Sequence, residues 1–234
     1  MDQPQTLNEV TLQGRERLFP SLTNPNWLVL RERRKIFARW LEQLPMTELD
    51  VLDVGGRVQP YRELIANRIR RYVGVDVQFT PLVDAVARAE QLPLGDATFD
   101  LVICTQVLQY IAEPSLVFAE IRRVLKPGGA LLLSVPSAGL IDGVEERWRF
   151  LPAGLRYLLA DFGMVEVVAE GSSALGFFRT LNICLDVFAR FPASRFIYRH
   201  SLAPLVNLSG ALAEELSGGR NQQFAVNYSV LAKK

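Results

Sequence analysis

Four residues in the first third of the chain have types and spacing that suit the binding of a nucleoside. Asp53, Gly55 and Gly56 end the apolar segment VLDVGG, and Asp76 ends the next apolar segment, YVGVD. Glycine allows a tight turn and a close approach of backbone to ligand. Asp76 follows Gly55 by 21 residues, close to the ~20-residue offset of a ribose-binding acid in dinucleotide folds. A purely structural turn with a solvated aspartate is the alternative.

The same turn argues against a dinucleotide cofactor. Arg57 and Gln59 stand where further glycines would be expected, and a pyrophosphate needs the backbone to come close at those positions. The sequence also lacks a Walker-type phosphate loop. An NAD-dependent oxidoreductase is therefore a weak alternative that rests on fold analogy alone.

The elements that must position these residues alternate between apolar strands and amphipathic helices. We predict strands at 51–54, 72–76, 82–87, 99–104, 130–136, 164–169 and 224–232, and helices at 27–44, 114–125 and 151–162, with a further helix beginning at Pro60. Strands that alternate with helices predict a mostly parallel sheet covered on both faces.

Three parts of the chain differ in pattern. Residues 1–44 contain a polar segment, which we interpret up to about residue 24 as a loose arm or lid, and then a helix. Residues 45–170 and 219–234 carry the predicted sheet. Residues 171–218 form an amphipathic insert or cap. Its polar stripe consists of Arg179, Asn182, Asp186 and Arg190, and its apolar side of Leu175, Phe178, Leu181, Leu185 and Phe188. The apolar side is a core or dimer face, or it contacts a membrane surface.

Composition narrows the function classes. The 26 basic and 25 acidic residues give a net charge of +1, so no nucleic-acid partner is expected. A single histidine, His200, excludes a multi-histidine metal site, and we predict no metal. Cys104 and Cys184 lie in separate apolar runs and are predicted to be buried free thiols, which favours a cytoplasmic location. No apolar run reaches the ~18 residues of a membrane span.

The motifs, taken in order, resemble those of the class I S-adenosylmethionine-dependent methyltransferases, in particular the type 11 branch. They are VLDVGG at 51–56, YVGVD at 72–76, RAEQLPLGDATFD at 88–100, LVICTQVLQYI at 101–111, VLKPGGALLLSVP at 124–136, ERWRFLPAGLRYLL from Glu146 and the final NYSVLAKK. The resemblance covers roughly 45–170 and the last ten residues. It implies an α/β, Rossmann-like fold: a mostly parallel seven-stranded sheet with helices on both faces, an antiparallel last strand and a helical insert before that strand.

The resemblance also implies a cofactor, S-adenosyl-L-methionine, with S-adenosyl-L-homocysteine as its product. It assigns the amino acid end of the cofactor to Asp53, Gly55 and Gly56, with Tyr61 nearby, the ribose to Asp76 and the adenine to Val77, Ala89 and Glu90. The methionine portion and the methyl group are assigned to Cys104, Thr105 and Gln106.

The acceptor is less well defined by the sequence. Gln106 and Tyr110 are the candidate catalytic residues because they follow the fourth strand closely. Trp148, Arg149 and Phe150 either border the acceptor pocket or pack the insert onto the sheet. The predicted reaction is methyl transfer to a small-molecule, glycan or lipid-linked acceptor. Departures from the family pattern at Arg57, Gln59, Arg88, Gln109 and Tyr110 support the alternative of a non-catalytic cofactor- or partner-binding module.

Overall fold

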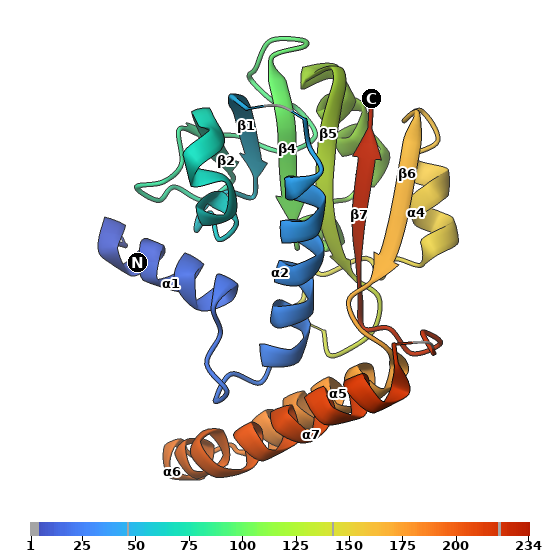
Figure 1. The fold of residues 1–234 in the computed structure, drawn as a ribbon. Helices are drawn as coiled ribbons and strands as arrows, with labels where there is room; N and C mark the ends of the chain where they lie inside the picture. Colours follow the sequence, from blue (N-terminus) through green and yellow to red (C-terminus); the bar gives the residue numbers. More distant parts are fainter. Residues whose placement is uncertain (1–4, 46, 142, 220) are drawn as a thin grey trace.

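One seven-stranded sheet organises the computed structural model, which describes residues 5–45, 47–141, 143–219 and 221–234 (Figure 1). The strands are β1 Leu49–Val54, β2 Ile69–Asp76, β3 Ala85–Val86, β4 Phe99–Thr105, β5 Leu125–Pro136, β6 Met164–Ala169 and β7 Asn227–Lys233. Their order is β3-β2-β1-β4-β5-β7-β6. The first five strands run parallel, and β7 is antiparallel to both β5 and β6. The predicted Rossmann-like fold is confirmed.

The central strands are buried on both faces, which explains their nearly continuous apolar sequences. All six residues of β1 are buried. Because neighbouring side chains of a strand point to opposite faces, Leu52 and Val102 join the hydrophobic cluster on one face of the sheet, and Val51 and Leu101 join the cluster on the other.

Helices cover both faces of the sheet (Figure 1). Helix α2, Trp27–Glu42, buries Phe37 and Trp40 in one cluster. Helices α3, Pro114–Val124, and α4, Pro152–Leu158, pack on the other cluster through residues such as Ile121 and Leu155. Both α3 and α4 begin with proline, whose missing N–H costs nothing in the first turn. Helix α4 corresponds to the helix predicted at 151–162 but is shorter, ending at Leu158.

The N-terminal segment differs from its prediction. The loose arm expected up to about residue 24 contains helix α1, Leu7–Leu18; residues 1–4 lie outside the described part. Thr6 and Glu9 form a capping box at its start, and this T-x-x-E pattern was the local signal for the helix. A Cβ at Gly14 would lie 2.1 Å from the carbonyl oxygen of Val58. Helix α1 is thus held against the loop that follows β1.

The helix expected from Pro60 is a 3-10 helix, η1, Arg62–Arg68; a second, η2, spans Leu108–Tyr110. The insert before the last strand comprises α5 Ser173–Phe188, α6 Pro192–Ile197, a π-helical turn η3 Tyr198–Leu202 and α7 Ala203–Ser217. In the described residues no helix combines the length and apolarity needed to cross a bilayer.

The two predicted sides of α5 are only partly reproduced. Leu175 of the apolar side is buried as expected, but Asn182 of the polar stripe is also fully buried, and Phe188 of the apolar side is 75% exposed. Cys184 is only partly buried, which differs from its prediction, whereas Cys104 is fully buried as predicted, and both thiols are free. Asn182 can be buried because its amide donates to the side chain of Asn207 on α7.

Candidate active site

Most of the residues predicted to bind the cofactor lie at or just after the carboxyl ends of neighbouring strands. Strands β1, β2, β4 and β5 run parallel, with Val54 paired to Val75 and to Cys104, and Thr105 paired to Ser134. Their carboxyl ends therefore lie together. The strand order reverses between β1 and β4, and such a switch point is where open α/β sheets bind ligands.

The turn after β1 requires glycine for space. Gly55 has φ +80°, and a Cβ there would lie 2.2 Å from a methyl group of Val107. The N–H groups of Gly55 and Gly56 both donate to the carbonyl oxygen of Val75, at 2.8 and 3.1 Å. The two glycines thus allow a ligand to come close to this loop. Their own N–H groups are already bonded to Val75.

The two residues that replace family glycines are accommodated in different ways. Gln59 adopts φ +44°, a left-handed conformation that favours glycine. Its side chain is fixed: Nε2 donates to the carbonyl oxygen of Leu82 at 2.5 Å, and Oε1 accepts from Arg62 at 3.0 Å. The guanidinium of Arg57 donates to the side-chain oxygen of Gln78 at 2.6 Å, two residues beyond Asp76.

Asp53 is buried at the end of β1. Its carboxylate accepts a hydrogen bond from the Tyr72 hydroxyl at 2.6 Å. Burial raises the pKa of Asp53 to about 7; the bond from Tyr72 opposes the rise, and the nearby charge of Asp76 adds to it. A carboxyl group that ionises with difficulty becomes a good partner for a ligand cation, because the cation compensates the buried charge.

This raised pKa makes stability depend on pH in a defined direction. An unfolded aspartate has a pKa of ~3.9, so between about pH 4 and pH 7 the folded protein binds more protons than the unfolded chain. The free energy of unfolding therefore falls as the pH rises through that window. Asp53→Asn is expected to unfold at a higher temperature than wild type, with a gain that grows to on the order of 4 kcal/mol at pH 8. Thermal melts from about pH 5 to pH 8 measure it. Asp161→Asn, an exposed position, is the control, and a gain independent of pH would contradict the assignment.

The residues predicted to contact ribose and adenine lie on the loops after β2 and β3. Asp76 is half-buried and accepts from the backbone N–H of Gln78 at 2.9 Å. Val77 is exposed and Ala89 packs in the core. Glu90 pairs with Arg88 at 2.7 Å through one oxygen, while its buried Oε2 has no hydrogen-bond partner among the described residues. A buried acceptor without a partner is suited to a ligand donor.

The remaining residues predicted to line the site follow the end of β4. Gln106 has φ +57°; its N–H donates to the carbonyl oxygen of Ser134 at 2.8 Å and its Nε2 donates to the hydroxyl of Ser134 at 3.1 Å. Non-glycine residues held in this conformation concentrate at functional sites. Thr105 and Tyr110 are half-buried. Burial raises the pKa of the Cys104 thiol, so Cys104 packs beside the site as an uncharged group.

A buried ionic network lies next to Gln106 and was not predicted from the sequence. Glu170, just after β6, accepts from Arg33 at 2.9 Å, Ser134 at 2.6 Å, Ser229 at 2.7 Å and Asn227 at 3.2 Å. These partners come from α2, β5 and β7, and no local pattern marks such distant pairs. Because Ser134 bonds both to Glu170 and to Gln106, the network helps to fix the position of Gln106 in the site.

Arg33 links this network to Tyr61. Burial lowers the pKa of the Arg33 guanidinium, but the charge of Glu170 and the nearby Tyr61 hydroxyl together raise it. The ring of Tyr61 packs against Phe37 with centroids 4.8 Å apart. Tyr61 is thus a buried core residue on the α2 face.

Of the three residues predicted near the acceptor, one is buried in the core and two are accessible. Phe150 is buried in the sheet core, which is the packing alternative. The Trp148 indole donates to the carbonyl oxygen of Ile111 at 2.7 Å, and Arg149 pairs with Glu146 at 2.6 Å. Both remain partly accessible, beside the loop that carries Tyr110.

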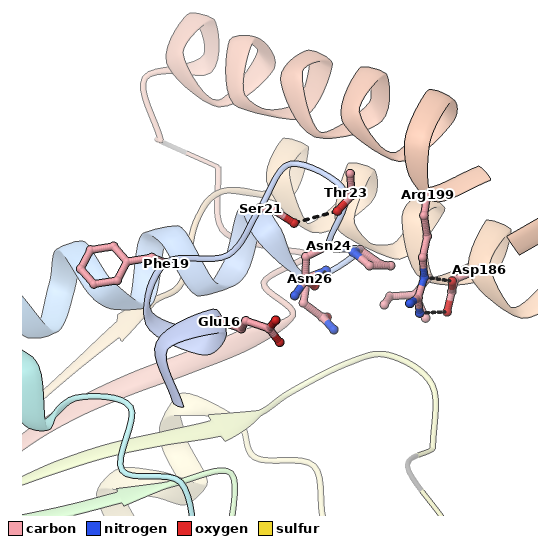
Figure 2. Close-up of a pocket in the computed structure, with 10 residues that line it drawn as sticks. Glu16, Phe19, Ser21, Thr23, Asn24, Asn26, Asp186 and Arg199 are labelled. Carbon is pink, nitrogen blue, oxygen red and sulfur yellow. Dashed lines mark hydrogen bonds and ion pairs between the residues drawn. The ribbon is translucent and has the colours of Figure 1, made fainter. Parts of the chain in front are cut away.

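A cavity of about 420 Å³ lies between the α1–α2 connection and the insert (Figure 2). It is lined by Glu16, Phe19, Ser21, Thr23, Asn24, Pro25, Asn26, Ile183, Asp186 and Arg199. The Arg199–Asp186 pair, 3.1 Å apart, faces the N-terminal segment across it. A second cavity of about 320 Å³ lies between α1 and η1. Neither cavity includes Asp76 or Gly55 in its lining.

Comparison with known proteins agrees with this geometry. Residues 52–133 match the model of the methyltransferase domain family, type 11. A malonyl-[acyl-carrier protein] O-methyltransferase from Alcanivorax borkumensis is 32% identical over 137 residues, which cover 52% of this chain and 46% of that protein. A ubiquinone biosynthesis O-methyltransferase from Pseudomonas paraeruginosa is 30% identical over 149 residues, covering 53% and 63%. The chain spans about half the length of the curated relatives it matches.

The fold comparison covers more of the chain. A phosphoethanolamine N-methyltransferase 2 from Haemonchus contortus, in complex with S-adenosylhomocysteine, superposes with a TM-score of 0.55 at 15% identity, covering 94% of this chain and 60% of that one. This likeness concerns the fold. The family match places a methyltransferase domain of type 11 within the chain, over residues 52–133, and the fold around it is the Rossmann-like fold of S-adenosylmethionine-dependent methyltransferases.

Proposed function

We propose that this protein transfers a methyl group from S-adenosyl-L-methionine to a small-molecule, glycan or lipid-linked acceptor. The observation that carries the proposal is that Asp53 and Asp76 lie at the carboxyl ends of the adjacent strands β1 and β2, beside the Gly55 turn at the switch point of the sheet, and that Glu90 after β3 has an unpartnered oxygen. These groups fit the cofactor: Asp76 would hold the ribose, Glu90 the adenine side and Asp53 the cationic amino acid end.

The bound cofactor supplies an already activated methyl group, so the protein's task is alignment and the exclusion of water. Alignment contributes up to ~7–11 kcal/mol, more than the ~10²–10⁴-fold of a positioned base. The fixed backbone of Gln106 suits that role, because Ser134 holds both its N–H and its side chain. We assign Gln106 and Tyr110 to contact with the acceptor nucleophile, and Trp148 and Arg149 to the border of its pocket.

The acceptor is proposed to enter beneath the sheet, between the N-terminal segment and the insert. Residues 1–44 would act as the lid, with α1 held over the β1 loop by Gly14. The names of the relatives, which refer to an acyl-carrier protein and to ubiquinone biosynthesis, support a small-molecule or carrier-linked acceptor. Two free cysteines support a cytoplasmic location.

A non-catalytic module that binds a cofactor or partner is the second candidate. It is favoured by Arg57, Gln59 and Arg88, which depart from the family pattern beside the predicted nucleoside site. Calorimetric titration with S-adenosylhomocysteine, S-adenosylmethionine and NAD tests the proposal. We expect micromolar dissociation constants for the first two and no binding of NAD. No binding of any of the three would move the assignment to a partner-binding scaffold.

A further inference from the structure

Helix α7 exposes its leucines and buries polar and small residues, the reverse of a helix that packs on a protein core. Leu205, Leu208, Leu212 and Leu216 form one stripe along it, and each side chain is between 53% and 80% exposed. The opposite side carries Ala203, Asn207 and Gly210, all buried. A surface helix of a globular protein normally turns its leucines inward. The leucine stripe is therefore left facing away from the rest of the chain.

The inward face cannot be exchanged for the outward one, because it is fixed by specific contacts. Asn207 donates to the carbonyl oxygens of Leu22 and Asn24, at 2.8 and 3.0 Å, and accepts from Asn182 on α5 at 2.8 Å. A Cβ at Gly210 would lie 2.7 Å from a methyl carbon of Leu28. Buried amides and a close helix contact thus set the rotation of α7, which lies alongside α5 below the sheet (Figure 1).

The rest of the insert extends the apolar surface and adds positive charge. Seven more large apolar side chains are exposed on α5, the α5–α6 connection, α6 and η3: Phe177, Val187, Phe188, Phe191, Phe196, Ile197 and Leu202. Arg190, Arg195 and Arg199 lie among them, and residues 187–213 contain no aspartate or glutamate. Asp186 pairs with Arg199 at 3.1 Å and with Arg195 at 3.9 Å, so it offsets one of the three charges. Two further acids lie at the C-terminal end of α7: Glu214, which accepts from the N–H of Ser172, and the exposed Glu215.

We propose that the outward face of residues 177–216 docks on an anionic lipid bilayer. Short helices with exposed phenylalanine and leucine beside arginine lie in the plane of a membrane surface, where the apolar side chains enter the headgroup boundary and the cations meet lipid phosphates. A second copy of this chain fits less well: a two-fold contact centred on residues 187–213 would bring the same arginines together, with no acid in that segment to pair with them.

Vesicle co-sedimentation with the full chain tests this docking. We expect binding to vesicles of phosphatidylcholine mixed with phosphatidylglycerol, and little binding to phosphatidylcholine alone. Changing Leu205, Leu208 and Leu212 together to Gln should weaken binding roughly tenfold or more, while the high helix propensity of Gln preserves α7. Leu12, Leu116 and Tyr157, which are exposed elsewhere, changed together to Gln, form the matched control and should bind as wild type does.

A second variant tests the charge separately. Arg190→Gln with Arg195→Gln should abolish the preference for phosphatidylglycerol without changing the melting temperature. Raising salt from 0.1 M to 1 M, which shortens the Debye length from about 10 Å to about 3 Å, should have the same effect on wild type.

Two outcomes would overturn the proposal. One is wild-type protein that stays in the supernatant with the anionic vesicles. The other is a dimer, seen by sedimentation velocity, that the leucine variant dissociates while neither protein binds vesicles; the face would then belong to a second copy. Neither outcome affects cofactor binding, which the calorimetry above tests independently.

Discussion

Glu170→Ala is expected to lower the free energy of unfolding by about 3–5 kcal/mol, because it leaves a buried guanidinium without its counter-charge. Arg33 and Glu170 are both almost fully buried, and their Nε–Oε1 distance is 2.9 Å. The change also removes the acceptor for the hydroxyls of Ser134 and Ser229. Urea or thermal unfolding, followed by circular dichroism, measures the loss.

The double variant Arg33→Met with Glu170→Leu is the matched control. It removes both charges together, so we expect it to be more stable than Glu170→Ala alone, although the serine hydroxyls stay without their acceptor. A double-mutant cycle completed with the single variants Arg33→Met and Glu170→Leu should give a coupling of more than ~1 kcal/mol. A single variant within ~0.5 kcal/mol of wild type would show that the network carries little stability.

Asp76→Ala is expected to weaken S-adenosylhomocysteine binding roughly 10- to 150-fold, since charged hydrogen bonds to the ribose are worth ~1.5–3 kcal/mol. Among the described residues the carboxylate accepts a hydrogen bond from the backbone N–H of Gln78, so the fold should survive the change. Calorimetric titration gives the affinity. An unchanged dissociation constant would refute the assigned ribose site, and Asp161→Ala, a remote exposed change, controls for a general loss of acidic charge.

The strands, their burial and the nucleoside turn could be predicted from local pattern. Periodicity marks strands such as VLDV and FDLVIC because a strand covered on both faces must be apolar at every position. Gly55 was recognisable because a glycine pair directly follows the apolar segment VLDV, and Asp76 because the offset between the two strand tips is characteristic. The structure adds the reason for glycine, since Val107 leaves no room for a side chain at position 55. The capping box at Thr6 and Glu9 could have revealed α1 from the same kind of local signal.

Tertiary structure alone decided which groups face one another. Glu170 gathers partners from α2, β5 and β7, which are more than thirty residues away in sequence, and a single sequence carries no record of such pairs. The insert shows the same limit. Its periodicity separated a polar from an apolar side, but only the contact between Asn182, Asn207 and the α1–α2 connection determined that Asn182 of the polar side is buried. The physical reason is that amphipathicity specifies two faces of a helix, whereas the chemistry of the packing partner specifies which of them is buried.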